Sequence, residues 1–154
     1  MQNLIDDVRA YSKAGHRAQI LMIEDNATDV LLTREALAEG HVLNDLEVMC
    51  RGEEALAHLY DPAVSRPDLI LLDLHLPGMS GQDVLIRLKN DPDLRSIPVV
   101  VLTTSDDEAD VLAAYKHHVN AYVRKPVDLT SFISIVSQTS NFWLSIVTLP
   151  RTER

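Results

Sequence analysis

The 154-residue sequence has a single cysteine, Cys50, so no disulfide can form within the chain. Cys50 lies near the end of an apolar strand pattern, which favours a small buried core residue over a nucleophile. No segment approaches the roughly 18 uninterrupted apolar residues that a membrane span needs. Asp6 and Asp7 interrupt the first apolar residues, so we expect no secretory signal, no membrane partner and a cytoplasmic location.

The chain also lacks an excess of positive charge, internal repeats and low-complexity segments. Its net charge of -9 would repel a phosphate backbone, which argues against nucleic acid as a partner. An apolar share of 46% and a charged share of 24% are typical of a soluble globular protein. The length suits one domain with a substantial core.

Short apolar runs alternate with amphipathic stretches along the chain. The five runs predict strands at residues 19–23, 46–50, 68–73, 97–104 and 120–125. The stretches between and after them predict helices at residues 26–40, 52–60, 81–90, 105–118 and 128–144. This alternation predicts an α/β fold, a doubly wound five-stranded parallel sheet with helices on both faces.

Local signals support the helix starts and one extra element. Asn26 with Asp29 is a predicted cap, and Ser105 with Glu108 matches a capping box. Residues 1–17 carry apolar residues at helical spacing, which predicts an N-terminal extension with a short helix.

Polar side chains follow the strands where each one ends. The first strand ends in Glu24 and Asp25, the third in Asp73, the fourth in Thr103 with Thr104, and the fifth in Lys125 with Pro126. In an open parallel sheet, ligands bind outside these carboxyl ends. The sequence therefore predicts that three carboxylates, a hydroxyl and one ammonium meet at a single edge.

Such a cluster needs a cation. Two carboxylates ~4 Å apart repel by about 4 kcal/mol at an effective dielectric of about 20, and Lys125 cannot balance three negative charges. Oxygen ligands with room for water suit Mg²⁺. A divalent ion beside a lysine and a hydroxyl also suits a phosphoryl group, and Asp73 would then be the nucleophile that forms an acyl phosphate.

Four segments carry a resemblance to a known family: MIEDN, LILLDLHLPGMSG, VVVLTT and YVRKP. At these residues the chain resembles the receiver domain of bacterial two-component response regulators, and we expect that domain over residues 18–138. The resemblance implies the flavodoxin-like strand order 2-1-3-4-5. It also implies a phosphoacceptor signalling module rather than an enzyme, with a sensor histidine kinase as phosphoryl donor.

The resemblance assigns roles to the residues at the strand ends. It implies that Asp73 accepts the phosphoryl group, that Asp25, Asp73 and the backbone carbonyl of His75 bind Mg²⁺, and that Glu24 acts mainly through water. Lys125 and Thr103, with the backbone of Thr104, would bind the phosphoryl oxygens. Two further features are implied: Thr103 and Tyr122 as the switch pair, and a cis peptide between Lys125 and Pro126.

Two positions depart from the commonest family pattern. Thr104 stands where Ala or Gly is usual, and His75 lies two residues after the acceptor, where side chains screen or align water. We therefore expect His75 and Thr104 to tune the lifetime of the phosphorylated state.

The end of the chain carries two apolar stripes. One stripe lines one face of the last helix and consists of Leu129, Phe132, Ile133, Val136 and Trp143. The second stripe lies on another face of the same helix. Residues 139–154 also resemble the tail of single-domain regulators that partner bacterial phytochrome kinases, which implies a homodimer. The candidate interface residues are Phe142, Trp143, Ile146 and Leu149.

Other functions stay open at this point. A phosphate sink, a phosphorelay intermediate and a receiver scaffold that is never phosphorylated fit the same residues. A hydrolase with an aspartyl-phosphate intermediate would want a second acid where His75 stands. We expect no DNA-binding or enzymatic output domain after the receiver, so output would pass through protein contacts or onward phosphotransfer.

Overall fold

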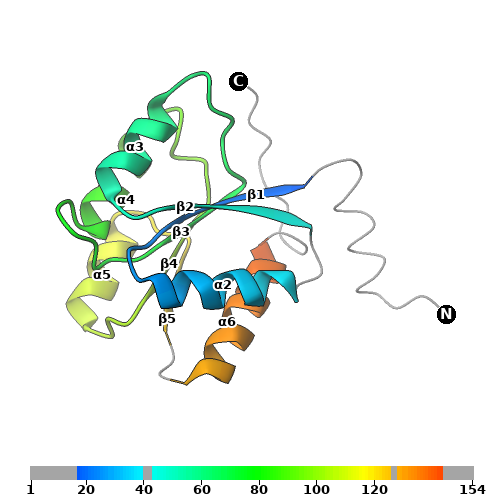
Figure 1. The fold of residues 1–154 in the computed structure, drawn as a ribbon. Helices are drawn as coiled ribbons and strands as arrows, with labels where there is room; N and C mark the ends of the chain where they lie inside the picture. Colours follow the sequence, from blue (N-terminus) through cyan, green and yellow to red (C-terminus); the bar gives the residue numbers. More distant parts are fainter. Residues whose placement is uncertain (1–16, 40–42, 126–127, 144–154) are drawn as a thin grey trace.

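Five parallel strands form one sheet in the order β2-β1-β3-β4-β5 in the computed structural model (Figure 1). The structure describes residues 17–39, 43–125 and 128–143. The predicted fold class and strand order are confirmed. The strands are β1 (Ala18–Ile23), β2 (Asn44–Met49), β3 (Leu69–Leu72), β4 (Val99–Thr103) and β5 (Ala121–Arg124).

The central strands are almost entirely apolar because helices cover both of their faces. Every residue of β3 and β4 is buried, whereas the edge strand β2 alternates between half-buried and exposed positions along most of its length. Ile23 of β1 pairs with Leu72 of β3, so these two strands end side by side. This register brings the residues that follow each strand to the same edge of the sheet.

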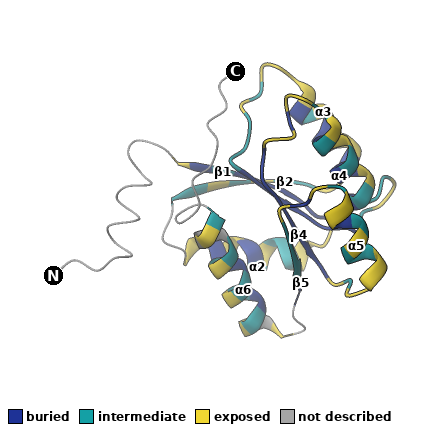
Figure 2. Cartoon of the chain, turned by 180° about the vertical axis from the view of Figure 1, so that it is seen from behind, coloured by how far each residue is buried: buried dark blue, intermediate teal, exposed yellow. Residues whose placement is uncertain are grey.

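Two helices cover one face of the sheet and three cover the other (Figure 2). The first face carries α2 (Ala27–Ala38) and α6 (Leu129–Asn141), and the second carries α3 (Gly52–Tyr60), α4 (Gly81–Asn90) and α5 (Glu108–Lys116). On the first face, the helices bury their inner sides against the sheet through Leu37, Phe132 and Val136.

The helix starts confirm one predicted cap and correct the other. The side chain of Asn26 accepts a hydrogen bond from the amide of Asp29, as predicted. The predicted capping box at Ser105 is wrong, because α5 begins later and Asp107 caps it by accepting from the amide of Ala109. The Ser105 hydroxyl instead donates to the carboxylate of Asp110 at 2.5 Å.

The prediction that Cys50 is a buried core residue is also wrong. Cys50 is exposed, because β2 is an edge strand that ends at Met49 and Cys50 lies in the bend after it. The predicted N-terminal helix in residues 1–17 falls almost entirely outside the described residues. None of the helices in the described ranges combines the length and apolar character that crossing a bilayer requires.

Candidate functional site

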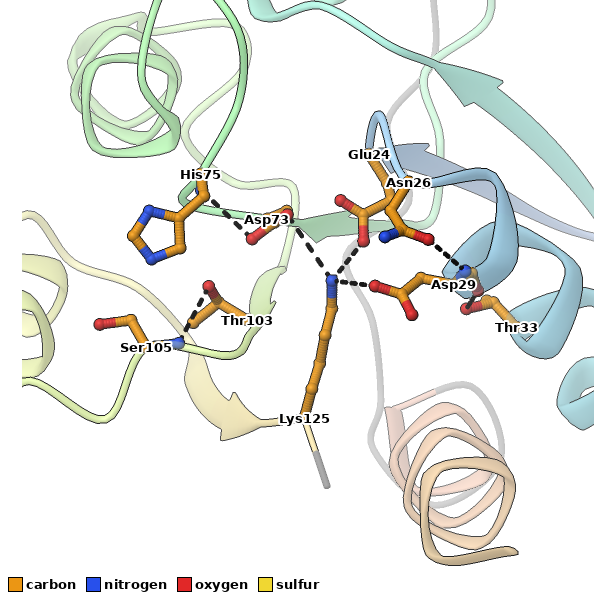
Figure 3. A network of polar contacts seen from close by, with 9 residues as sticks. All are labelled: Glu24, Asn26, Asp29, Thr33, Asp73, His75, Thr103, Ser105 and Lys125. Atoms are coloured by element: carbon orange, nitrogen blue, oxygen red, sulfur yellow. Dashed lines mark hydrogen bonds and ion pairs between the residues drawn. The ribbon is translucent and has the colours of Figure 1, made fainter. Parts of the chain in front are cut away.

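Side chains from four strands meet at the carboxyl edge of the sheet (Figure 3). Glu24 follows β1, Asp73 follows β3, Thr103 is the last residue of β4 and Lys125 follows β5. All four are buried, although Asp73 keeps 8% of its surface exposed. A reactive carboxylate oxygen of Asp73 therefore stays within reach of a ligand from solvent.

Lys125 is the cation at the centre of this cluster. Its ammonium donates to Glu24 and, at 2.8 Å, to Asp29, and it lies 3.6 Å from a carboxylate oxygen of Asp73. Burial alone would lower the pKa of Lys125, but hydrogen bonds to Asp29 and Glu24 outweigh it and raise that pKa. The side chain therefore stays charged, and it is held by carboxylates from two different elements.

Glu24 is the most deeply buried acid of the site, with no exposed surface. Burial and hydrogen bonding with Asp73 raise its pKa to about 9, although Lys125 opposes the rise. One of its carboxylate oxygens, Oε2, is buried without a hydrogen-bond partner. Such an orphaned acceptor is costly unless a cation or another donor reaches it.

Asp73 is held as an anion despite its burial. Burial alone would raise the pKa of Asp73, but hydrogen bonding with Glu24 and the charge of Lys125 lower it. The amide of His75 also donates to its Oδ1 at 3.2 Å. A depressed pKa keeps Asp73 in the nucleophilic form at neutral pH.

Ligand atoms of Glu24, Asp25 and Asp73 lie within 4.8 Å of one another. Asp25 is exposed, so an ion could enter from solvent. The oxygen donors, the excess negative charge and the orphaned oxygen of Glu24 all fit a hard divalent cation. The residues present thus form a suitable divalent metal site.

A polar relay leads away from Thr103. The amide of Ser105 contacts the Thr103 hydroxyl oxygen at 3.5 Å, and Tyr122 donates its hydroxyl proton to the Ser105 carbonyl at 2.8 Å. Burial and nearby aspartates raise the pKa of Tyr122. Thr104, beside this relay, is exposed. Thr103 and Tyr122 are therefore connected through one residue of the loop between β4 and α5.

A side chain of α3 holds the loop that follows Asp73. Glu53 accepts a hydrogen bond from the amide of Met79 at 2.9 Å, and Gly78 takes a positive φ of 73°. A Cβ atom on Gly81 would lie 2.2 Å from the carbonyl oxygen of Asp73. The glycine lets the start of α4 pack directly against the backbone of Asp73.

Most predicted site residues come together, and some lie elsewhere. Glu24, Asp73, Thr103 and Lys125 meet as expected, with Asp25 in the acidic cluster. The exposed His75 donates a hydrogen bond from its amide to Asp73, and the roles of its carbonyl and side chain stay predictions. Pro126, with the predicted cis peptide, lies outside the described residues.

The candidate interface residues are only partly described. Phe142 is 48% exposed, and its ring meets that of Trp143 edge to face at 5.8 Å. Trp143 packs against the core cluster that includes Leu71 and Val100, so part of its surface is already used within the chain. Ile146 and Leu149 lie outside the described residues, and the interface stays a prediction.

Sequence reasoning missed two residues of the site. The sequence predicts Asp29 only as part of a helix cap, and Glu53 only as part of a helix. The signal for Asp29 is its place in the first turn of α2, because that end of the helix directly follows the carboxyl end of β1. No spacing in the sequence links Glu53 to Met79, because that contact depends on how α3 and the loop pack.

Residues 20–137 match the family described as the response regulator receiver domain, and the chain belongs to this family. Receiver domains are signalling phosphoacceptors rather than true enzymes, as the sequence predicted. The fold and the acidic edge of the sheet agree with this assignment.

One relative and two solved structures are informative. The chain is 43% identical over 135 residues to the response regulator Rcp1 of Synechocystis sp., covering 85% of this chain and 92% of Rcp1. The structure of the phosphorylated cyanobacterial phytochrome response regulator RcpA is 44% identical, with a TM-score of 0.85, covering 88% of this chain and 100% of RcpA. The Mn²⁺-bound form of Rcp1 is 42% identical, with a TM-score of 0.83 and coverage of 87% and 99%.

Proposed function

We propose that Asp73 accepts a phosphoryl group from the phosphohistidine of a sensor histidine kinase. The observation that carries this proposal is the Asp73 carboxylate, which keeps part of its surface exposed and lies 3.6 Å from the Lys125 ammonium. Its lowered pKa favours the anionic form. An oxygen of Asp73 would attack phosphorus while the phosphorus–nitrogen bond breaks, and that electron pair stays on the kinase imidazole. The product is an acyl phosphate on Asp73.

The chain's own groups support this transfer. Glu24, Asp25, Asp73 and the carbonyl of His75 would hold Mg²⁺, which when bound neutralises phosphoryl charge. Lys125 supplies a second positive charge to the phosphoryl oxygens. Thr103, buried at the end of the neighbouring strand, donates its hydroxyl, and the backbone of Thr104 adds a donor.

The relay through Ser105 supports a switching role. If Thr103 turns its hydroxyl toward new phosphoryl oxygens, the loop that holds the Tyr122 hydroxyl must adjust. Tyr122 and α5 would then change their surface, so that phosphorylation shifts a two-state equilibrium between partners. The lifetime of the phosphorylated state would depend on the exposed residues His75, two positions after the acceptor, and Thr104, which follows β4.

The names of the similar proteins support a more specific role. A relative with 44% identity is a cyanobacterial phytochrome response regulator, so we propose a phytochrome-type histidine kinase as phosphoryl donor. We further propose that this regulator acts in the cytoplasm and forms a homodimer through the end of α6 and the tail, residues 139–154. Phe142 is the described residue whose exposed aromatic ring fits that role best.

The direct test is the intact mass of the protein after incubation with acetyl phosphate, with and without Mg²⁺. We expect a gain of one phosphoryl group that needs Mg²⁺ and is absent in Asp73→Asn. Asp83→Asn, which changes an exposed aspartate of α4, is the control and should gain the group. Failure with acetyl phosphate and with a phosphorylated phytochrome kinase would leave the scaffold function instead.

The kinase and the dimer need separate measurements. Transfer from a purified bacterial phytochrome kinase should be faster than from an unrelated histidine kinase, and equal rates would contradict the phytochrome link. Sedimentation of Phe142→Ala beside the unchanged protein tests the dimer. Loss of a dimer in the variant supports the proposed interface, and an unchanged dimer contradicts it.

A further inference from the structure

The strongest unexplained contact of the site is the ion pair between Asp29 and Lys125. The Lys125 ammonium donates to Oδ2 of Asp29 at 2.8 Å, which is closer than its 3.6 Å distance to Asp73 (Figure 3). The Asp29 side chain is 21% exposed and that of Lys125 only 4%. Asp29 lies outside the group of carboxylates that could hold a metal ion.

The helix itself does not need the Asp29 carboxylate as a cap. Asn26 caps α2 by accepting from the backbone amide of Asp29, and the hydroxyl of Thr33 donates to the backbone carbonyl of Asp29 at 2.7 Å. Both contacts use backbone atoms of Asp29. The carboxylate is thereby positioned toward Lys125 by a backbone that is fixed on both sides.

A second helix of the chain offers a natural comparison. In α4, Ser80 caps the helix by accepting from the amide of Asp83, which is the third helical residue, as Asp29 is in α2. Each aspartate lies in the first turn of its own helix, where the helix dipole favours a negative charge. In the part of the chain that the structure describes, Asp83 pairs with no lysine, so only Asp29 adds an ion pair to this common position.

The direct hydrogen bonds of Lys125 use two of its three ammonium protons. An ammonium group has three protons to donate, and Glu24 and Asp29 take the direct hydrogen bonds while Asp73 receives a longer contact. A phosphoryl group on Asp73 brings new anionic oxygens to this position. It must compete with Asp29 for the position and the positive charge of the Lys125 ammonium, which lies nearer to Asp29 than to Asp73.

We propose that Asp29 is a positioning residue that holds Lys125 in competition with the phosphoryl group on Asp73. This inference rests on the proposed phosphoacceptor function. By binding Lys125, Asp29 weakens the hold of the site on a phosphoryl group. It shortens the life of the acyl phosphate and favours return to the unphosphorylated state.

The test uses beryllium fluoride, which binds a carboxylate oxygen and mimics a phosphoryl group, in the presence of Mg²⁺. We measure its affinity by ¹⁹F NMR for the unchanged protein, Asp29→Asn, Asp29→Glu and Asp83→Asn. Removing one ion pair of modest strength should tighten binding in Asp29→Asn about fivefold. Asp29→Glu keeps the competing charge and Asp83→Asn keeps the ion pair, so both should bind as the unchanged protein does.

The decay of the acyl phosphate gives a second readout. After acetyl phosphate is removed, intact mass measurements follow the fraction of protein that still carries the phosphoryl group. This fraction should fall more slowly for Asp29→Asn than for Asp83→Asn. Equal or weaker affinity in Asp29→Asn, or the same change in Asp83→Asn, would overturn the proposal. If the unchanged protein takes up neither beryllium fluoride nor a phosphoryl group, the phosphoacceptor function itself fails, which is a different result.

Discussion

The hydroxyl of Tyr122 donates a 2.8 Å hydrogen bond to the carbonyl oxygen of Ser105 and so connects β5 with the loop after β4. The amide of the same Ser105 lies 3.5 Å from the Thr103 hydroxyl oxygen. The two proposed switch residues therefore contact opposite sides of one peptide segment. A movement of Thr103 cannot leave the environment of Tyr122 unchanged.

Tyr122→Phe should loosen this loop while it keeps the aromatic ring. Loss of one hydrogen bond to a half-buried carbonyl should lower the free energy of unfolding by about 1 kcal/mol. Amide hydrogen exchange in residues 104–107 should become faster. Tyr115→Phe, which removes a hydroxyl from a tyrosine that is 51% exposed on α5, is the control and should change neither quantity. Equal exchange in both variants would contradict the relay.

Gly81→Ala should disturb the acceptor directly. The new Cβ would lie 2.2 Å from the carbonyl oxygen of Asp73 and 2.5 Å from Cα of Leu74, and backbone atoms cannot move aside cheaply. We expect a loss of roughly 2 kcal/mol or more in the free energy of unfolding. Slower phosphorylation by acetyl phosphate should accompany it. Thermal unfolding and intact mass measure the two effects.

Gly52→Ala is the matched control for that change. Gly52 is also the first residue of its helix, but its Cβ would meet the side chain of Val84 at 2.5 Å, with the nearest backbone atom, of Met79, at 3.6 Å. This variant should lose stability while Asp73 keeps its place, so its phosphorylation rate should stay near that of the unchanged protein. Equal rate losses in the two variants would refute a direct effect on Asp73.

Divalent cations should stabilise the fold. The carboxylates of Asp25 and Asp73 lie close together and repel one another, and an ion bound only by the folded state relieves that repulsion. At ten times its dissociation constant, Mg²⁺ should add about 1.4 kcal/mol to the free energy of unfolding. For a domain of this size, that raises the midpoint of thermal unfolding by roughly 3–6 °C.

The control for the cation effect is Asp25→Asn at matched ionic strength. Asp25 is exposed, so its replacement leaves no buried charge unpaired. The variant should need more Mg²⁺ for the same rise in midpoint, and chelation with EDTA should reverse the rise in both proteins. A midpoint that follows ionic strength alone would contradict a specific site.

The sequence predicts the fold and the strand-end residues because both depend on local rules. Apolar runs of five to eight residues between amphipathic stretches leave few alternatives to a parallel sheet. The order 2-1-3-4-5 follows from the family resemblance. Once strands are parallel, the residues after them must share an edge. Glu24, Asp73 and Lys125 meet for that reason.

The contacts that the sequence did not predict depend on packing between distant elements. Asp29 reaches Lys125 across 96 residues, and Glu53 reaches Met79 across 26. The start of α5 was misplaced because Ser105 and Asp107 both suit a cap, and Ser105 is engaged by Asp110 instead. Side chains with several possible partners cannot be assigned by spacing alone.

Lys89 should make stability depend on pH at alkaline values. Its ammonium donates to the carbonyl oxygens of Arg95 and Ile97 and to the side chain of Asn120, and burial lowers its pKa from 10.5 to about 8. Between those two values, the unfolded chain binds more protons than the folded one. The free energy of unfolding should therefore rise with pH in this window.

Comparison with Lys89→Met isolates this contribution from other titrating groups. The stability of the unchanged protein relative to the variant should increase between pH 8 and 10.5. Because Lys89 is only half-buried, we expect about 1 kcal/mol across the window rather than the full value of the shift. Lys116→Met, at an exposed position of α5, should show no such rise. Urea unfolding at several pH values measures the slopes, and parallel curves for the unchanged protein and Lys89→Met would mean that Lys89 keeps its proton throughout.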